Sequence, residues 1–571
     1  MGNLNTKGVA QNTYDAIVIG SGMTGGWVAK ELCDHGIKTL VLERGKNVTH
    51  LKDYPTATMD PWDLPHRNRL PQKVRDENPV VSKCYAFRED AMHFFVKDKE
   101  HPYIQEKPFD WIRGYQVGGK SLMWGRGSHR WNKFNFEAPA RDGYAIDWPI
   151  RYEDLAPWYS HVEKFVGVCG NKDGLETFPD GEFLPAFELN VVEKTIQKRL
   201  ASLYKDRHMV AGRAAHLTQP TELHLQQGRG KCNARNLCQR GCPFGGYFSA
   251  NSSTLPWAAK TGNLTLRPDS VVHSIIYDSK KGKASGVRVI DAQTKQITEY
   301  FANVIFLNAA TLNSNLVLLH STSDRFPEGL GNDNGLLGKY VAFHIYRAGV
   351  SADMEGFLDS YYYGRRPAST LIPSFRNVHK HDSDFLGGYV TFLSASRSGF
   401  GHSVEGEQVG LEYKDAISEP GSWKVGLSIQ GETIPKETNH VRLSKDQKDE
   451  WGMPTLITSV AYDDNDENMI KDFLAQGSEM LEKVGCKNIK TRDNHQAPGL
   501  DIHEMGGIRM GKDPKTSLLN KWNQLHACKN VYVTDGSCMA STGHHSPSLT
   551  FMTIAARAAN HAVDELKKGN I

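Results

Sequence analysis

Residues 16–25 read Ala-Ile-Val-Ile-Gly-Ser-Gly-Met-Thr-Gly. The four apolar residues predict a short buried parallel strand, and glycines follow it at once. We expect a helix over 27–33 that ends near Gly36, and a second buried strand over 39–42 that Glu43 closes. This order of strand, glycine turn, helix, strand and acid indicates a Rossmann-like α/β unit that binds a dinucleotide.

The three glycines of this turn have different physical tasks. Gly20 permits a tight turn, Gly22 lets the backbone approach a pyrophosphate, and Gly25 lets the helix pack on the strand. The phosphates would then meet unpaired N–H groups at the positive end of the helix dipole. Glu43 ends the second strand, where a carboxylate can accept hydrogen bonds from ribose hydroxyls.

Length and charge limit the possible functions. The chain has 571 residues, 68 Lys and Arg against 65 Asp and Glu, and a net charge of +3. The length exceeds one ordinary core, and the near-neutral charge predicts no partnership with nucleic acid. No apolar run reaches the ~18 residues of a membrane span. Residues 1–13 lack the features of a secretory signal. Two localisations therefore stay open: the cytoplasm, or the periplasm after export with a partner.

The rest of the chain alternates between two patterns. Residues 46–110 show little periodicity and are interpreted as an irregular excursion over the surface. We expect a helix running to Val166, a buried strand over 304–307, and antiparallel strands between about 345 and 495. The final seventy residues return to strand, loop and helix, with the strand 531–534 followed by Asp535-Gly536 and a helix over 549–563.

Four segments together carry a resemblance to a known family. They are the glycine turn, 118–125 (Gly-Gly-Lys-Ser-Leu-Met-Trp-Gly), 503–511 (His-Glu-Met-Gly-Gly-Ile-Arg-Met-Gly) and 535–550, from Asp-Gly-Ser to Ser-Pro-Ser-Leu-Thr. In this order the chain resembles the glucose–methanol–choline (GMC) oxidoreductases over nearly its full length. The resemblance implies a Rossmann-like FAD-binding domain with a parallel sheet, plus a substrate domain built on an antiparallel sheet.

The resemblance also divides the chain. It implies a discontinuous FAD-binding domain made of 14–130, 230–344 and 495–571, which includes the excursion over 46–110. Residues 145–229 and 345–494 would form the substrate-binding domain. The family's flavin contacts, carried over position by position, fall on Gly20, Gly22, Gly25, Glu43, Gly118, Gly119, Ser121, Trp124, Val272, Asp535 and Gly536.

Oxidation of an alcohol needs a group that takes the hydroxyl proton while a hydride leaves for flavin N5. A neutral histidine suits this task. His503 opens the motif whose histidine has this role in the family. The family's second group, His or Asn before a proline, is replaced here by Ser546, with His544 and His545 upstream. We expect His545 to supply the second imidazole, and leave His544 and Ser546 as alternatives.

Three cysteines, Cys232, Cys238 and Cys242, fall within eleven residues, and Pro243 follows the third. Soft thiolates at such spacing bind iron–sulfur clusters or zinc. Zinc would need a fourth ligand, for which His216 and His224 are the nearest candidates. Three ligands suit a [3Fe–4S] cluster, and the spacing resembles that of cluster-bearing sugar dehydrogenases of this family. Unligated thiols are the remaining alternative.

Such a cluster predicts a dehydrogenase rather than an oxidase, because it passes electrons from reduced FAD to a cytochrome or a quinone-linked carrier. The motifs look most like those of glucoside 3-dehydrogenase catalytic subunits, which oxidise C3 of glucosides to 3-keto products, sometimes with a small companion subunit. A gluconate, fructose or glucose dehydrogenase subunit, or a flavin electron-transfer subunit without alcohol oxidation, are the alternatives. Candidate substrate contacts are Gln430, Glu432 and the aromatic residues Trp423, Tyr361, Tyr362 and Tyr363.

Overall fold

The computed structural model describes residues 12–360, 369–399 and 409–571, and these contain three β-sheets. The first sheet has the order β19-β20-β8-β1-β2-β5, and β1, β2, β5, β8 and β20 run parallel along this path. Strands β6 and β7 continue it antiparallel from β8. The strands of this sheet are β1 (Thr13–Ile19), β2 (Thr39–Leu42), β5 (Leu264–Arg267), β6 (Ser270–Asp278), β7 (Lys283–Asp291), β8 (Ile297–Leu307), β19 (Gln524–Leu525) and β20 (Cys528–Val533).

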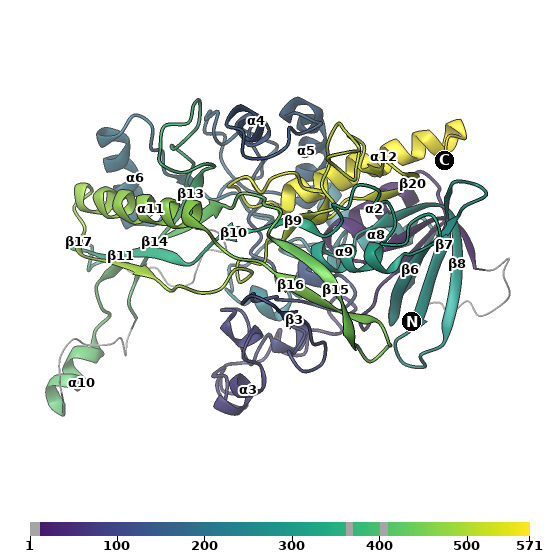
Figure 1. Cartoon of the computed structure of the whole chain (residues 1–571). Helices are drawn as coiled ribbons and strands as arrows, with labels where there is room; N and C mark the ends of the chain where they lie inside the picture. Colours follow the sequence, from purple (N-terminus) through teal and green to yellow (C-terminus); the bar gives the residue numbers. More distant parts are fainter. Residues whose placement is uncertain (1–11, 361–368, 400–408) are drawn as a thin grey trace.

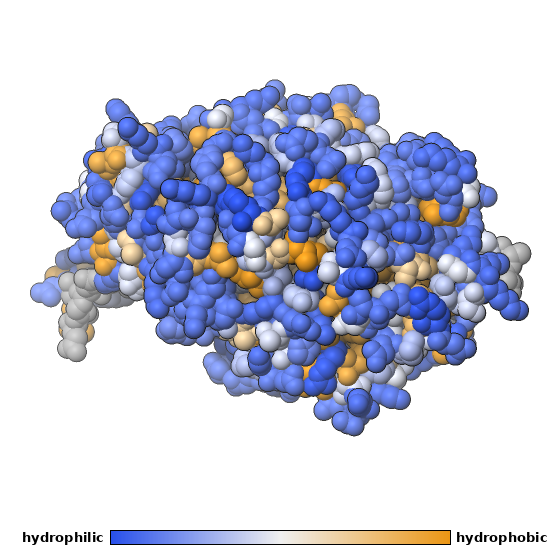
Figure 2. Space-filling view, turned by 45° about the horizontal axis from the view of Figure 1, so that its top comes forward, coloured by the Kyte–Doolittle hydropathy of each residue, from blue (hydrophilic) through white to orange (hydrophobic). Residues whose placement is uncertain are grey.

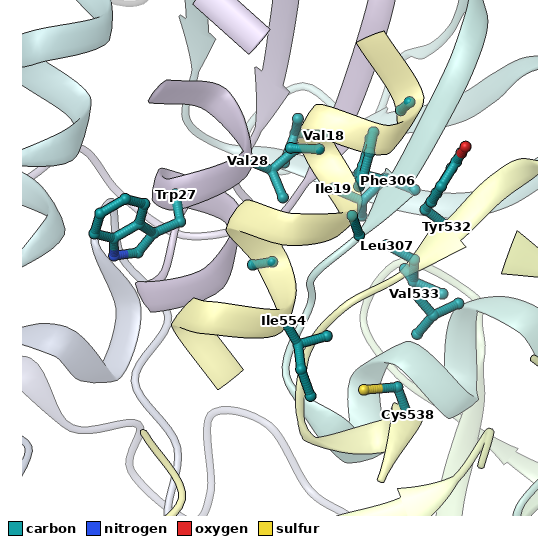
Figure 3. Close-up of a cluster of buried hydrophobic side chains, with 14 of the residues drawn as sticks. Val18, Ile19, Trp27, Val28, Phe306, Leu307, Tyr532, Val533, Cys538 and Ile554 are labelled. Carbon is teal, nitrogen blue, oxygen red and sulfur yellow. The ribbon is translucent and has the colours of Figure 1, made fainter. Parts of the chain in front are cut away.

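Helices from distant parts of the sequence cover the parallel strands. Helix α2 (Met23–Asp34) begins directly after Gly22, and α12 (Ser548–Lys568) packs on both α2 and α5 (Tyr152–Val166). Figure 3 shows the core between them, where Val18, Val28, Leu307 and Ile554 gather. The expected strand–helix–strand unit and the C-terminal helix are therefore confirmed, and the contact between α12 and α2 brings residues 548–568 next to residues 23–34.

The second sheet is antiparallel throughout, with the order β17-β11-β14-β13-β12-β4 and β10 paired to β14. Helix α11 (Asp464–Lys483) lies along it and contacts β11, β14 and β17 (Figure 1). This confirms the antiparallel sheet expected in 345–495. Its strands are β4 (Val210–Ala211), β10 (His344–Ile345), β11 (Ala348–Met354), β12 (Thr370–Ile372), β13 (Tyr389–Arg397), β14 (Trp423–Glu432) and β17 (Lys487–Asp493).

A third, smaller sheet was not expected from the sequence pattern. Its order is β18-β9-β15-β16-β3. The strands are β3 (Ile104–Gln105), β9 (Lys339–Ala342), β15 (His440–Lys448), β16 (Pro454–Ser459) and β18 (Met505–Gly507). Because β18 begins two residues after His503, this sheet anchors the segment that presents the predicted base.

The segment 46–110 is more than a surface excursion, which corrects that expectation. It is largely irregular, with α3 (Gln72–Glu77), short 3₁₀ turns and β3, but Tyr54, Phe87 and Phe94 are buried in a hydrophobic cluster that also includes Leu122 and Met123. The periodicity is missing because the buried aliphatic and aromatic side chains of this cluster come from largely irregular backbone, not from one regular helix or strand face. The remaining α-helices are α4 (Lys133–Arg141), α6 (Val191–Leu203), α7 (Glu222–Gln226), α8 (Thr254–Lys260), α9 (Thr311–His320) and α10 (Leu411–Ser418).

The face shown in Figure 2 is mostly hydrophilic, with apolar residues scattered in small groups. Among the described residues, no helix combines the length and hydropathy that crossing a membrane requires.

Candidate active site

A cavity of about 1320 Å³ lies between the parallel sheet and the antiparallel sheet, and residues of both line it. This volume exceeds the roughly 300–1000 Å³ of ordinary small-molecule pockets, so it has room for a large cofactor and a substrate. The glycine turn and the loop after β20 form one part of its wall, and side chains of β13 and β14 form another. Of the predicted flavin contacts, it is lined by Gly20, Gly22, Glu43, Gly119, Ser121, Trp124, Val272, Asp535 and Gly536.

The glycines divide into packing positions and an open position. Gly20 has a φ of +99°, and a Cβ there would overlap the carbonyl of Asn308. A Cβ on Gly25 would overlap the carbonyl oxygen of Gly20, whereas one on Gly22 would meet nothing within 4 Å. Gly22 caps α2 without any side-chain hydrogen bond. The first turn of the helix is thus left free for an anion such as a pyrophosphate.

Glu43 is buried where β2 ends, and its carboxylate holds the glycine turn together. One oxygen accepts hydrogen bonds from Ser21 N at 3.2 Å and Ser21 Oγ at 2.6 Å, and the other accepts from Gly45 N at 3.0 Å. Burial raises the pKa of this carboxyl, and the bonds from Ser21 and Gly45 oppose that rise. Each carboxylate oxygen has two lone pairs, so a ribose hydroxyl can still be bound.

The second glycine cluster is tied to the first. Gly118 N donates to Ser21 Oγ at 3.0 Å, and Ser121 Oγ donates to Gly118 O at 2.6 Å. Gly118 packs on Asn251 behind the cavity wall, as Gly25 does on Gly20, so these two predicted contacts support the turn rather than face the cavity. Trp124 lines the cavity and donates from Nε1 to Phe248 O at 2.9 Å.

Asp535 is buried two residues after β20, where Ser314 Oγ donates to one carboxylate oxygen. Its other oxygen accepts from Ser537 N at 3.0 Å. Val272 lies on β6 in the same wall. The structure therefore brings together residues from positions 20 to 536 around one cavity. Their open helix terminus and buried carboxylates fit a dinucleotide such as FAD.

His503 reaches this cavity from the loop before β18 and is partly exposed to it. Its backbone N–H donates to Asp501 Oδ2 at 3.1 Å, and its Nδ1 lies 2.9 Å from Nδ1 of His344. Burial, and then the neighbouring His344 and Lys120, lower the pKa of His503 well below its usual value of 6.5. The imidazole is consequently neutral at neutral pH and able to accept a proton.

The three candidates for a second group occupy different places. Ser546 lines the cavity, with Oγ 3.5 Å from Gln430 Oε1. The His545 ring instead stacks on Phe178, with centroids 5.7 Å apart, and its Nδ1 lies 3.3 Å from Asn135 Oδ1. His544 also contacts Asn135, with its Nδ1 3.2 Å from Asn135 Nδ2. The loop thus directs both imidazoles into the layer behind the wall, and the favoured role of His545 gains no support from its placement.

The two polar residues predicted on β14 also separate. Gln430 lines the cavity and donates from Nε2 to His544 O at 3.0 Å. Glu432 is buried outside the cavity wall, where Oε1 accepts from Tyr144 Oη at 3.2 Å and Gly543 N at 3.1 Å. Burial raises the pKa of Glu432 to about 8. This carboxyl braces the 542–546 loop through Gly543, and its place outside the cavity wall gives no support to the predicted substrate contact.

Among the predicted aromatic contacts, Trp423 lines the cavity, while Tyr361, Tyr362 and Tyr363 lie outside the described residues. Sequence reasoning missed His129 and Lys120. His129 is a buried histidine of the cavity wall whose pKa burial lowers to about 3. Lys120 forms an ion pair of 3.0 Å with Glu504, next to His503. Their only signal in the sequence is that Lys120 lies within the 118–125 segment and His129 lies four residues after it.

The three predicted metal ligands lie on one partly exposed loop, and Cys238 reaches the same cavity. Burial raises the pKa of Cys232, and the thiols of Cys238 and Cys242 raise it further. In the part of the chain that the structure describes, the three sulfurs do not gather within 4.8 Å of one another. A single zinc with bonds of about 2.3 Å would hold its sulfurs closer than that, so the three side chains do not form a ready-made zinc site.

Cationic and imidazole groups surround this loop with unused donors. Among the described residues, Arg126 Nε and Nη1, Arg229 Nη2 and both ring nitrogens of His216 are buried without a hydrogen-bond partner. Arg126 is near enough to Cys232 to favour its thiolate, and Arg229 interacts with Cys242. Buried donors are normally satisfied. An anionic group held by the three cysteines would fit these donors, and a three-thiolate iron–sulfur cluster has that character.

Comparison with known proteins adds family and fold. Two sequence models, both described as GMC oxidoreductase, match residues 14–345 and 435–555. In a search of solved structures, pyridoxine 4-oxidase from Mesorbium loti matches with a TM-score of 0.59 and 16% identity, covering 96% of this chain and 99% of that one. The predicted fold class, a parallel Rossmann-like sheet with an antiparallel sheet, is confirmed.

Relatives with named activities match nearly end to end. A 2-methyl-1,2-propanediol dehydrogenase of Mycolicibacterium austroafricanum is 27% identical over 96% of this chain and 94% of its own. A 6'''-hydroxyparomomycin C oxidase of Streptomyces lividus is 25% identical, over 98% and 93%. The fructose dehydrogenase large subunit of Gluconobacter japonicus is 23% identical, over 97% and 98%. Dehydrogenases and an oxidase thus stand at similar identity.

Proposed function

This chain belongs to the GMC oxidoreductase family, and we propose that it is an FAD-dependent dehydrogenase that oxidises a secondary hydroxyl group of a sugar or glycoside. The family and the relatives support a flavoprotein that oxidises hydroxyl groups. One observation carries the proposal: the glycine turn with Glu43 and the neutral His503 line the same cavity. FAD held by the glycine turn and Glu43 would supply the acceptor for the hydride of the substrate carbon.

The side chains of this protein supply the proton chemistry and the positioning. His503 accepts the hydroxyl proton, because burial keeps its imidazole unprotonated. Ser546 and Gln430 line the cavity and are the polar groups we propose as contacts for the substrate hydroxyls. Trp423 adds an aromatic side chain to the same wall, where it can pack on a sugar ring.

Within this class we propose C3 of glucosides as the carbon that is oxidised. The support is the motif resemblance together with the fructose dehydrogenase large subunit as a relative that acts on a sugar. Turnover of methyl glucoside with an artificial electron acceptor, followed by NMR of the product, tests it. A C3 ketone is expected. A ketone at another carbon would favour the fructose or gluconate dehydrogenase type, and absence of turnover by flavin-loaded protein would overturn alcohol oxidation.

We further propose that Cys232, Cys238 and Cys242 hold a [3Fe–4S] cluster that passes electrons to a cytochrome or quinone-linked carrier. The support is the set of buried donors around the loop and the position of Cys238 at the cavity. A small companion subunit could take part in the same electron transfer from the cluster to the carrier.

Cys238→Ala should remove the cluster, because two thiolates cannot replace three. We expect iron content and the EPR signal of anaerobically purified protein to fall at least tenfold, while FAD stoichiometry is kept. Cys486→Ala is the matched control, since this buried thiol lies directly before β17, in the part of the chain that forms the antiparallel sheet. Wild-type protein that holds no iron after anaerobic purification would contradict the cluster.

The pH dependence of kcat/KM reports on the base. A base works unprotonated, so activity is lost as pH falls through the pKa of its free form. Because burial lowers the pKa of His503 well below 6.5, kcat/KM should stay at its plateau at about pH 6. The measurement uses an acceptor whose reduction does not depend on pH. An acid limb with an apparent pKa above that of free histidine would show that His503 is not the base.

A further inference from the structure

His344, on β10, is a second histidine built into the site behind His503. Its imidazole is fully buried and stands perpendicular to that of His503, with ring centroids 5.1 Å apart. The two Nδ1 atoms lie 2.9 Å from each other, which is a hydrogen-bond distance. Asp501 Oδ2 accepts hydrogen bonds from the backbone N–H of His344 at 2.9 Å and of His503 at 3.1 Å. These bonds hold the two backbone segments next to each other.

The other nitrogen of His344 decides where its proton is. Nε2 lies 2.9 Å from Gly543 O and 3.2 Å from Thr542 O. Carbonyl oxygens only accept hydrogen bonds, so Nε2 must carry the proton. Burial lowers the pKa of His344 to about 4, which leaves one proton on the ring at neutral pH. Nδ1 of His344 therefore has no proton and accepts a hydrogen bond through its lone pair. The proton between the two histidines is on Nδ1 of His503.

We propose that His344 is a positioning residue that fixes the tautomer of His503, so that Nδ1 of His503 carries the proton and Nε2 keeps its lone pair for the substrate hydroxyl. The chain of bonds runs from the Gly543 carbonyl through His344 to His503. A neutral imidazole has one donor and one acceptor nitrogen. With Nδ1 committed to His344, only Nε2 of His503 can act as the base.

The same bonds hold two distant loops together. His503 belongs to the loop before β18, while Thr542 and Gly543 precede Ser546, the second polar group of the cavity. Glu432, paired with His344 across β10 and β14, accepts from Gly543 N at 3.1 Å. The positions of His503 and of the loop that carries Ser546 thus depend on His344 and Glu432, which are paired in the antiparallel sheet.

A metal ion is the competing explanation for this cluster. His344, Asp501 and His503 each offer one ligand atom, and these atoms lie within 4.8 Å of one another. Hydrogen bonds already account for the contacts of His344 Nδ1, His503 Nδ1 and Asp501 Oδ2. A stoichiometric divalent metal in purified protein, lost in a His344 variant, would overturn the tautomer proposal.

Two substitutions separate the hydrogen bond from simple packing. His344→Leu removes the acceptor, leaving the Nδ1–H of His503 without a buried partner and favouring the wrong tautomer. His344→Asn can place Oδ1 where Nδ1 was and restore the acceptor. We expect kcat to fall about 10- to 100-fold in His344→Leu with KM changed less than about threefold, and His344→Asn to recover most of the loss. Flavin content and Tm of both variants check that the fold is kept.

The inference rests on His503 being the base, so a second measurement does not depend on turnover. In protein with ¹⁵N-labelled histidine, assigned by comparison with His503→Asn, we expect a protonated Nδ1 and an unprotonated Nε2 for His503 in wild type. The reversed pattern is expected in His344→Leu. Protonated Nε2 in wild type, or equal kcat loss in the Leu and Asn variants, would overturn the proposal. Wild-type protein with the expected tautomer but no alcohol oxidation would overturn only the proposed function.

Discussion

His503→Asn is expected to lower kcat for sugar oxidation by about 10³-fold, while FAD stays bound at wild-type stoichiometry. A positioned general base contributes roughly 10²- to 10⁴-fold, and His503 is the neutral imidazole at this cavity that the family motif also identifies. Asparagine keeps a donor for His344 Nδ1 and the backbone bond to Asp501, so the loop should hold its shape. Anaerobic reduction of the flavin by substrate measures the loss directly.

Ser546→Ala is the comparison for this result. Ser546 Oγ lies 3.5 Å from Gln430 Oε1, which is a long contact, so its removal should cost less than about tenfold in kcat/KM. A larger loss in Ser546→Ala than in His503→Asn would assign the proton transfer to the 542–546 loop. In that case His503 would not be the main base.

Gly25→Ala is the second large effect, and it acts on folding. The added Cβ would overlap the carbonyl oxygen of Gly20, so α2 must move away from β1. Overpacking in a core usually costs about 1–3 kcal/mol, and backbone cannot move aside as a side chain can. We expect the free energy of unfolding to fall by more than about 3 kcal/mol and the purified protein to lack flavin. Urea unfolding and the visible spectrum measure both.

Gly22→Ala, three residues earlier, separates folding from cofactor binding. Its Cβ would meet nothing within 4 Å in the protein, but it points where the pyrophosphate is expected. The apoprotein should keep its stability within about 1 kcal/mol while FAD affinity falls at least tenfold. If Gly22→Ala binds FAD as wild type does, the phosphates do not approach this turn. If Gly25→Ala is as stable as wild type, the packing argument is wrong.

The nucleotide-binding half could be predicted because its signals are local. Strand β1, the glycine turn, α2, β2 and Glu43 follow one another directly in sequence, and each requirement concerns a near neighbour. The C-terminal strand and helix followed from the same patterns. The antiparallel sheet was visible in the alternation of apolar residues over residues such as 423–429, which form part of β14. His503 was found through the motif that opens with it.

The orientation of loop side chains could not be predicted in this way. His544, His545 and Ser546 are consecutive, yet Ser546 lines the cavity and the two histidines pack near Asn135. Gln430 and Glu432 are polar residues of the same strand, but only Gln430 lines the cavity. Glu432 lies outside the cavity wall, where it accepts hydrogen bonds from Gly543 and Tyr144. Each outcome depends on a partner more than 100 positions away, which no spacing within one segment indicates.

The chain's local order of apolar runs, glycines and acids established a dinucleotide site and a family, because strand, turn and helix propensities act between neighbours. The protonation state of His503, the proposed base, is different. His344 and His503 are 159 positions apart, and their bond exists only because β10 and the loop before β18 are packed together. Which nitrogen of His503 holds the proton therefore depends on the folded arrangement, since burial and the Gly543 carbonyl act on His344 only there.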